Sequence, residues 1–182
     1  HITCYLGRKG ILFFLHLPRF MQPIHHIFSQ LTTPRKVVIT THQKPDPDAM
    51  GSSLGLYHFL TNFGHEITVI SPTNWANFLD WMPGADKVIN FEMNRERSEA
   101  IILAADWIFC LDFNTLIRTK SLAPIIERAG ATKILVDHHQ EPAIESFQYG
   151  VSDTSKSSTC EMVFDFIVAS GHGDQISLPI AE

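Results

Sequence analysis

Short apolar runs alternate with helical patterns along most of this chain, and that alternation narrows the folds open to it. Three runs, 37–41, 107–111 and 133–136, are rich in Val, Ile, Leu and Phe. Continuous apolar runs of this length are typical of strands buried on both faces of a sheet. The segments between the runs carry apolar residues at helical spacing. We therefore predict an α/β fold, a mainly parallel, doubly wound sheet with helices on both faces.

The other elements follow from periodicity and from turn residues. A glycine follows three of the helical patterns and is expected to end each helix. The loop 72–84 contains Trp75, Phe78 and Trp81, which we expect to be core residues rather than platforms for stacked bases. The expected helices are 22–31, 54–63, 95–105, 122–129 and 159–170, and the further strands are 65–70, 87–91 and 146–149.

Composition limits the classes of function. The chain has 182 residues, of which 45% are hydrophobic and 18% charged, as in an ordinary globular domain. Its net charge of -5 argues against broad binding to a nucleic-acid duplex. Cys4, Cys110 and Cys160 are odd in number and not closely paired, so we expect a reducing, cytoplasmic location without disulfides. No run approaches the roughly 20 apolar residues of a membrane span.

The first residues differ from the rest of the chain. We expect residues 1–20 to be an extension outside the fold. The alternatives are a genuine extra segment or a weak targeting signal, because the apolar stretch 11–17 follows Arg8 and Lys9. That stretch leads into no small-residue cleavage site, which disfavours a signal peptide.

Polar, titratable residues follow each of the three apolar runs. They are His42, Asp46 and Asp48 after the first run, Asp112 after the second, and Asp137, His138 and His139 after the third. In parallel sheets ligands bind beyond the carboxyl ends of the strands, so these side chains are expected to converge. We expect Pro45 and Pro47 to hold the first loop extended and a helix to open at 51–53, where its N–H groups favour an anion. The pattern predicts a metal site for phosphate chemistry.

Each of these groups also has a simpler interpretation. Asp46 and Asp48 flank a proline and could form an ordinary turn. Asp112 could cap the segment that follows it, and Asp153 could be an ordinary loop aspartate. The segment 137–139 is harder to explain in this way, because three adjacent titratable groups at the end of a buried strand are costly unless paired or metal-bound. Together the groups favour a functional site.

In chain order, four segments resemble the four motifs of the DHH phosphoesterase superfamily. They are HQKPDPDAMGS (42–52), LDFN (111–114), VDHH (136–139) and DTSKSST (153–159). The closest resemblance is to the bifunctional oligoribonuclease and 3′-phosphoadenosine 5′-phosphate phosphatase group, the nanoRNase-type enzymes. It covers about residues 24–171. One departure is Pro47, where the group commonly has glycine.

The resemblance implies a centre of two Mn²⁺ ions with a bridging carboxylate. Carboxylate and imidazole ligands also suit Mn²⁺ better than thiolate-rich sets do. One ion would be held by His42, Asp46 and Asp112, and the other by Asp48, Asp112, His138 and Asp153.

Further residues receive roles from the same resemblance. His139 would lie near the scissile phosphate, and Asp137 would orient the histidine pair, so that these two and Asp112 form the catalytic set. Asn114, Arg118 and Ser52 would contact substrate. For Arg118, plain surface charge is an equal alternative.

The resemblance implies a Mn²⁺-dependent phosphoesterase that uses a two-metal-activated hydroxide on short oligoribonucleotides or 3′,5′-bisphosphorylated nucleosides. The alternatives are pyrophosphate, a cyclic dinucleotide or single-stranded DNA as substrate, or a catalytically silent nucleotide-binding module. We expect residues 21–175 to be the catalytic domain and 176–182 to begin a linker to an absent substrate-binding domain. Turnover by this chain would then be weak. We expect short RNA or a nucleotide as partner, no membrane, and a possible homodimer.

Overall fold

The computed structural model describes residues 5–6, 12–13 and 20–181. Most of the expected N-terminal extension, and with it most of the apolar stretch 11–17, lies outside the described residues. Its two described pieces, β1 (Tyr5–Leu6) and β2 (Leu12–Phe13), pair antiparallel with each other. None of the helices in the described part combines the length and the apolar character that crossing a membrane requires.

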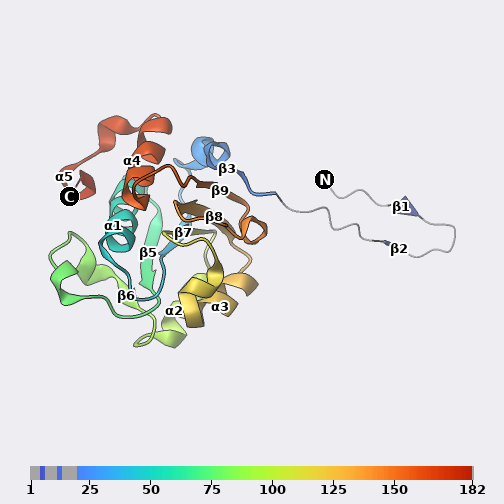
Figure 1. Ribbon diagram of the computed structural model, residues 1–182, viewed down its shortest axis with the longest axis horizontal. Coiled ribbons are helices and arrows are strands. Elements are labelled where there is room, and N and C mark those ends of the chain that lie inside the picture. Colours follow the sequence, from blue (N-terminus) through green and yellow to red (C-terminus); the bar gives the residue numbers. More distant parts are fainter. Residues whose placement is uncertain (1–4, 7–11, 14–19, 182) are drawn as a thin grey trace.

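One seven-stranded sheet organises the domain (Figure 1). All of its neighbouring strands pair parallel, which confirms the predicted α/β class. In spatial order the strands are β3 (Gln22–Pro23), β9 (Tyr149–Ser152), β8 (Thr132–Asp137), β7 (Trp107–Leu111), β4 (Lys36–Thr40), β5 (Glu66–Ser71) and β6 (Ile89–Asn90).

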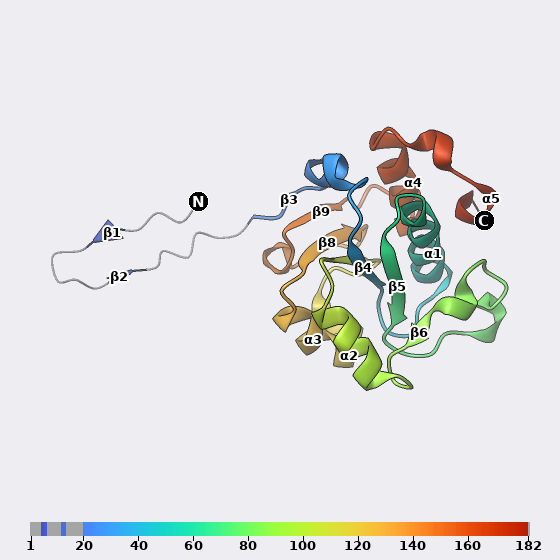
Figure 2. The ribbon, with the colours of Figure 1, turned by 180° about the vertical axis from the view of Figure 1, so that it is seen from behind.

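Helices cover both faces of this sheet. On one face α1 (Pro47–Thr61) and α4 (Thr159–Ala169) pack together with the 3-10 helix η1 (Ile24–Gln30), and on the other lie α2 (Arg95–Leu103) and α3 (Ala123–Arg128) (Figures 1 and 2). The remaining helices are short. They are η2 (Asn77–Leu79), η3 (Ala85–Lys87), η4 (Leu116–Leu122), η5 (Ile144–Ser146), η6 (Gly173–Gln175) and α5 (Leu178–Ala181).

The central strands divide the apolar core into two layers. Alternate side chains of a strand point to opposite faces. In β7, Phe109 therefore packs on the α1 and α4 side, whereas Ile108 and Cys110 pack on the α2 and α3 side. All three are fully buried, as the sequence run predicted.

The helix after the first strand begins earlier than expected. It starts at Pro47, and Asp46 is its N-cap, with a carboxylate oxygen that accepts from the Ala49 N–H at 3.0 Å. The prediction of an extended loop up to a helix start at 51–53 was therefore wrong. Proline is favoured at the first helical position, because its missing N–H would have no partner there.

Several smaller boundaries also differ from the prediction. The helix expected at 22–31 is the 3-10 helix η1. The strand expected at 146–149 is β9, which begins three residues later, and the strand expected at 87–91 shortens to β6. Gly64 and Gly171 do end helices with positive φ, but Gly130 does not adopt that conformation.

The loop 72–84 corrects the prediction for its aromatic residues. Leu79 is buried against α1, and Trp75 is partly buried. Phe78 and Trp81 were expected in the core, yet they are 67% and 63% exposed. Leu79 packs on α1 between them, and Phe78 and Trp81 face solvent.

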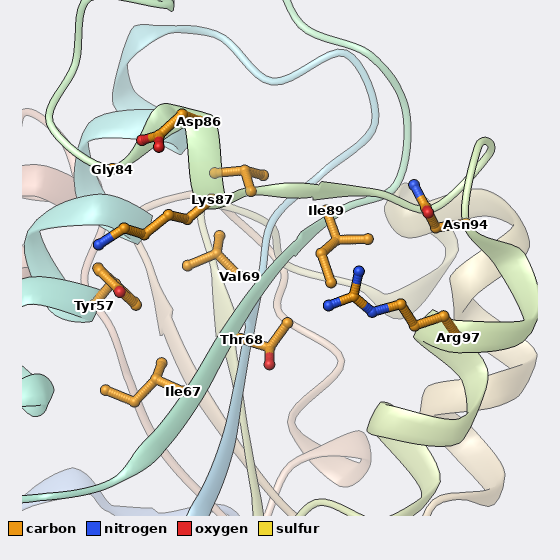
Figure 3. A pocket seen from close by; sticks show the side chains of 11 residues that line it. Tyr57, Ile67, Thr68, Val69, Gly84, Asp86, Lys87, Ile89, Asn94 and Arg97 are labelled. Atoms are coloured by element: carbon orange, nitrogen blue, oxygen red, sulfur yellow. The ribbon is translucent and has the colours of Figure 1, made fainter.

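A pocket lies at an open edge of the sheet. β6 pairs only with Ile70 and Ser71, so the first half of β5 lacks a partner strand there. This pocket of about 460 Å³ has Tyr57, Lys87 and Arg97 among its lining residues (Figure 3). None of the predicted ligand residues lines this pocket.

Candidate metal centre

The carboxyl ends of β4, β7 and β8 lie side by side because these three strands are neighbours in the sheet. Hydrogen bonds tie the segments that follow them. Asp112 donates its N–H to the Val136 carbonyl at 3.1 Å, and Gln43 donates its N–H to the Arg118 carbonyl at 2.9 Å. The topology thus brings the predicted side chains from three distant parts of the sequence to one edge.

Asp112 is the central residue of the site. It is buried, and its φ of 63° is a conformation that residues other than glycine rarely adopt. One carboxylate oxygen, Oδ2, lies 3.4 Å from Nε2 of His42. The other, Oδ1, lies 3.6 Å from Nε2 of His138 and accepts from the Thr159 hydroxyl at 2.9 Å. Asp112 therefore joins two groups of potential ligands.

The first group consists of His42, Asp46 and Asp112. His42 Nδ1 lies 2.8 Å from the Gln43 carbonyl oxygen. A carbonyl can only accept, so Nδ1 carries the hydrogen and Nε2 presents a lone pair. That lone pair faces the carboxylates of Asp112 and Asp46. Oδ2 of Asp46 lies 3.9 Å from Nε2 of His42.

The second group consists of Asp112, His138 and His139. His138 repeats the arrangement of His42, because its Nδ1 lies 3.3 Å from the Lys156 carbonyl oxygen. Its Nε2 also lies 3.7 Å from Oδ2 of Asp48. Histidines that bind metals characteristically donate their other ring N–H to a carbonyl or carboxylate in this way.

Asp137 orients His139. Its fully buried carboxylate lies 2.7 Å from Nδ1 of His139 and accepts the His139 backbone N–H at 3.1 Å. The ring is thereby fixed through Nδ1, and Nε2 is left for another partner.

Asp48 has a second, structural role. Its two carboxylate oxygens accept the backbone N–H groups of Thr159 and Cys160, each at 2.8 Å. These are the first two residues of α4, so Asp48 satisfies donors that a helix start leaves open. It therefore joins the starts of α1 and α4 next to His138.

The electrostatics of Asp112 and His42 are coupled. Burial is the largest influence on each and disfavours its charged form. Hydrogen bonds from His42, when its ring carries both protons, and from Thr159, with the charges of His42 and His139, outweigh burial and lower the pKa of Asp112. The pKa of His42 is raised in the same way, by hydrogen bonds to Asp112 and to the Gln43 carbonyl and by the charges of Asp112 and Asp46. The negative charge of Asp112 and the positive charge of His42 therefore stabilise each other.

Two predicted residues lie apart from these groups. The Asp153 carboxylate accepts from the backbone N–H and the hydroxyl of Ser155, and it belongs to neither group. Ser52 is 1% exposed and donates its hydroxyl to the Ala49 carbonyl within α1. This hydrogen bond lies within its own helix, and the predicted substrate contact of Ser52 stays a prediction.

Asn114 lies on the loop that follows β7, and Arg118 lies in η4, which follows that loop. Asn114 donates its amide to the Gln140 carbonyl at 2.7 Å and so ties this loop to the one after His139. Arg118 is partly buried, and within the described part of the chain its guanidinium forms no ion pair.

Sequence reasoning missed two partners of the site. The Thr159 hydroxyl holds Asp112, and the Lys156 carbonyl holds His138. Both residues lie in the fourth motif, but nothing in their spacing indicates which side chain they contact.

The donor set fits a divalent cation. Nitrogen lone pairs and carboxylate oxygens face one another across 3.4–3.9 Å, an arrangement that a cation between them would stabilise. The thiol of Cys160 lies close to this site, with its Sγ 3.5 Å from the Asp48 carbonyl oxygen. Burial, followed by the Asp48 hydrogen bond, raises the pKa of this thiol, so thiolate ligation is disfavoured. Oxygen and imidazole ligands without thiolate are typical of Mn²⁺ and related ions.

Comparisons with known proteins bear on the fold and the family. The sequence model of the DHH family, N-terminal domain, matches residues 36–182. The chain is 28% identical over 135 residues to a probable bifunctional oligoribonuclease and PAP phosphatase NrnA from Streptococcus mutans, a match that covers 71% of this chain and 37% of that protein. It also superposes with a TM-score of 0.83 and 37% identity on the crystal structure of an exopolyphosphatase-related protein from Bacteroides fragilis, covering 86% of this chain and 46% of the other. The chain thus spans less than half the length of each of these two proteins.

Proposed function

The chain belongs to the DHH family, whose N-terminal domain it contains, and from this premise we propose that it is a metal-dependent phosphoesterase. Its cofactors are two Mn²⁺ ions, and its substrates are short oligoribonucleotides and 3′,5′-bisphosphorylated nucleosides. The family match confirms the resemblance that the four motifs indicated. The observation that carries the proposal is Asp112, whose two carboxylate oxygens face two different histidines.

The proposed ligands divide between the two ions. We assign His42 and Asp46 to one ion, Asp48 and His138 to the other, and Asp112 to both. Asp153 would join the second ion only by leaving Ser155. Divalent cations held there would act as Lewis acids on the phosphoryl group and would activate water at neutral pH.

The protein's own residues fix the geometry before substrate arrives. Asp137 holds His139 through Nδ1, so that Nε2 is left to contact the phosphoryl group or the leaving oxygen. Thr159 donates its hydroxyl to Oδ1 of Asp112 and keeps that oxygen directed toward the second group. Such preorganisation lowers the cost of reaching the transition state.

Arg118 is the candidate contact for a substrate phosphate. Its backbone carbonyl accepts from Gln43, which places it beside the first group of ligands. Its guanidinium forms no ion pair among the described residues and is free to bind an anion bidentately. Asn114 supports this loop through its bond to Gln140.

The names of two relatives motivate the choice of substrates. The Streptococcus mutans protein is named for oligoribonuclease and PAP phosphatase activity, and the Bacteroides fragilis protein is called exopolyphosphatase-related. We place short RNA and bisphosphorylated nucleosides first and include polyphosphate as a comparison substrate.

The test is hydrolysis of adenosine 3′,5′-bisphosphate, a pentaribonucleotide and polyphosphate by this chain with excess MnCl₂. We expect Mn²⁺-dependent phosphate release from the bisphosphate and nucleotide release from the RNA, and neither in EDTA. Asp112→Ala should lower both rates roughly 10²–10³-fold or more, because it removes a ligand shared by both ions.

Asp174→Ala is the matched control, since it removes an exposed carboxylate of η6 outside the site. It should hydrolyse both substrates like the original chain. Full activity of Asp112→Ala would refute the assignment. Mn²⁺ binding in calorimetry without turnover of any substrate would instead favour a silent nucleotide-binding module.

A further inference from the structure

Segment 72–84 carries two aromatic side chains on the protein surface. Phe78 is 67% exposed and Trp81 is 63% exposed, whereas Leu79 between them is 2% exposed. Large aromatic rings contribute most to stability when they are buried. An exposed pair on one short segment therefore suggests a contact surface for a ligand.

The segment is anchored on α1 while its two aromatic rings point into solvent. Leu79 packs with Met50 and Leu54 of α1, which anchors the middle of the segment. Trp75 donates its indole N–H to the Asp80 carboxylate at 2.9 Å, which fixes the turn around it. The exposed rings thus stand on a segment that is itself anchored.

Two contacts place this segment beside the candidate metal centre. Lys44, two residues after His42, donates its N–H to the Thr73 hydroxyl at 2.7 Å. Met50 donates its N–H to the Asp46 carbonyl at 3.0 Å and lies one turn of helix, about 5.4 Å, beyond that residue. A strand of a few nucleotides with a phosphate at Asp46 would therefore reach the segment.

Lys44 adds a positive charge at the junction. Its side chain is exposed and makes no ion pair within the described part of the chain. Its φ of 51° is held by the contact with Thr73. A cation joined at Thr73 to the segment that carries the exposed aromatic rings supplies both features that bind single-stranded nucleic acid, a charge for phosphates and rings for stacked bases.

We propose that Phe78, Trp81 and Lys44 form a stacking surface for the bases of a single-stranded RNA whose scissile phosphate lies at the metal centre. This inference rests on the proposed function and extends it to the recognition of nucleotides beyond the cleaved bond. Single strands are the ligand because bases within a duplex already stack on each other. The net charge of -5 also disfavours a duplex.

The test compares a pentaribonucleotide, which can span the site and the surface, with adenosine 3′,5′-bisphosphate, which has one base. Phe78→Ala and Trp81→Ala should each lower kcat/KM for the pentaribonucleotide about fivefold or more. They should leave kcat/KM for the bisphosphate within about twofold of the original. Fluorescence anisotropy of a labelled pentaribonucleotide in EDTA should show the same losses in affinity.

Phe20→Ala is the matched control, because Phe20 is 68% exposed and precedes β3 at the opposite edge of the sheet. It should change neither measurement. Original affinity and kcat/KM in both test variants, or equal losses in Phe20→Ala, would overturn the proposal. If the chain hydrolysed neither substrate, the proposed function would fail, and the anisotropy series in EDTA would still decide whether this surface binds RNA.

Discussion

His65, immediately before β5, is a buried histidine whose two ring nitrogens each have a hydrogen-bond partner. Nδ1 accepts the Arg35 N–H at 3.1 Å, and Nε2 lies 2.7 Å from the Leu31 carbonyl oxygen. Burial, with the Arg35 charge, lowers the pKa of His65 below 6.5 against the opposing effect of the Leu31 hydrogen bond. Protonation at Nδ1 would also break the bond from Arg35.

This lowered pKa predicts a loss of stability in acid. The unfolded chain binds the proton more readily than the folded one, so the free energy of unfolding should fall as pH drops below the ordinary histidine pKa of about 6.5. His65→Gln, which can accept and donate at the same positions, should weaken that dependence. Urea unfolding across this pH range measures it. His26→Gln removes an exposed histidine and should not change the pH dependence; parallel curves for His65→Gln and the original chain would contradict the prediction.

At the scale of single residues, the sequence predicts which side chains converge at the site. It does not predict the other hydrogen bonds that these side chains make. His42, Asp112 and His138 follow strands that lie side by side, and they do converge. The capping of α4 by Asp48 could not be predicted, because it joins residues more than a hundred positions apart. The hydrogen bond from the Ser155 N–H to the Asp153 carboxylate depends on the loop conformation, which the spacing of residues in the motif does not specify.

At the scale of elements, the loop between β9 and α4 controls the orientation of His138. Lys156 presents its backbone carbonyl to Nδ1 of that histidine. Its ammonium group pairs with Asp165 at 2.6 Å and Glu161 at 3.1 Å, both on α4. These ion pairs are exposed and individually weak. Their effect is to hold the carbonyl in place.

Lys156→Ala should therefore weaken Mn²⁺ binding about tenfold, the lower end of what loss of a ligand's hydrogen-bond partner costs. Asp165→Asn should act in the same direction, because it removes one of the two ion pairs. Isothermal titration calorimetry with MnCl₂ measures the affinity. Arg128→Ala breaks the exposed pair between Arg128 and Glu99 on the opposite face of the sheet, and it should leave the affinity unchanged. Equal affinity in all three variants would show that the loop does not need this anchor.

Elements differ in how well local sequence specifies them. The strand 107–111 was predicted to the residue, because a continuous apolar run between polar neighbours has few alternatives. The start of α1 was misread because Pro45 and Pro47 favour both an extended loop and a helix N-terminus. The outcome depends on whether Asp46 can cap the helix, which it does through Ala49.

For the whole molecule, the candidate metal centre joins the segments that follow three neighbouring strands. Its ligands come from the loop between β4 and α1, from the end of β7, and from the segment after β8 that Lys156 ties to α4. Without a cation, three carboxylates of like charge lie close together there. A bound cation would therefore stabilise the folded chain and not only activate substrate.

We expect MnCl₂ to raise the thermal midpoint of unfolding. At a free concentration one hundred times its Kd, a ligand that binds only the folded state adds about 2.7 kcal/mol. For a chain of this size that corresponds to a shift of about 5–10 °C. Differential scanning fluorimetry against EDTA measures the shift without any substrate.

Asp112→Ala should lose this shift, because the residue serves both groups of ligands, whereas Asp174→Ala should keep it. His42→Ala and His138→Ala should each keep part of it, since each removes a ligand from one group only. An equal shift in Asp112→Ala would place the stabilising cation elsewhere on the molecule. Complete loss of the shift in both histidine variants would show that the two ions bind only together. In that case each ion would need the other to hold the Asp112 carboxylate in position between them.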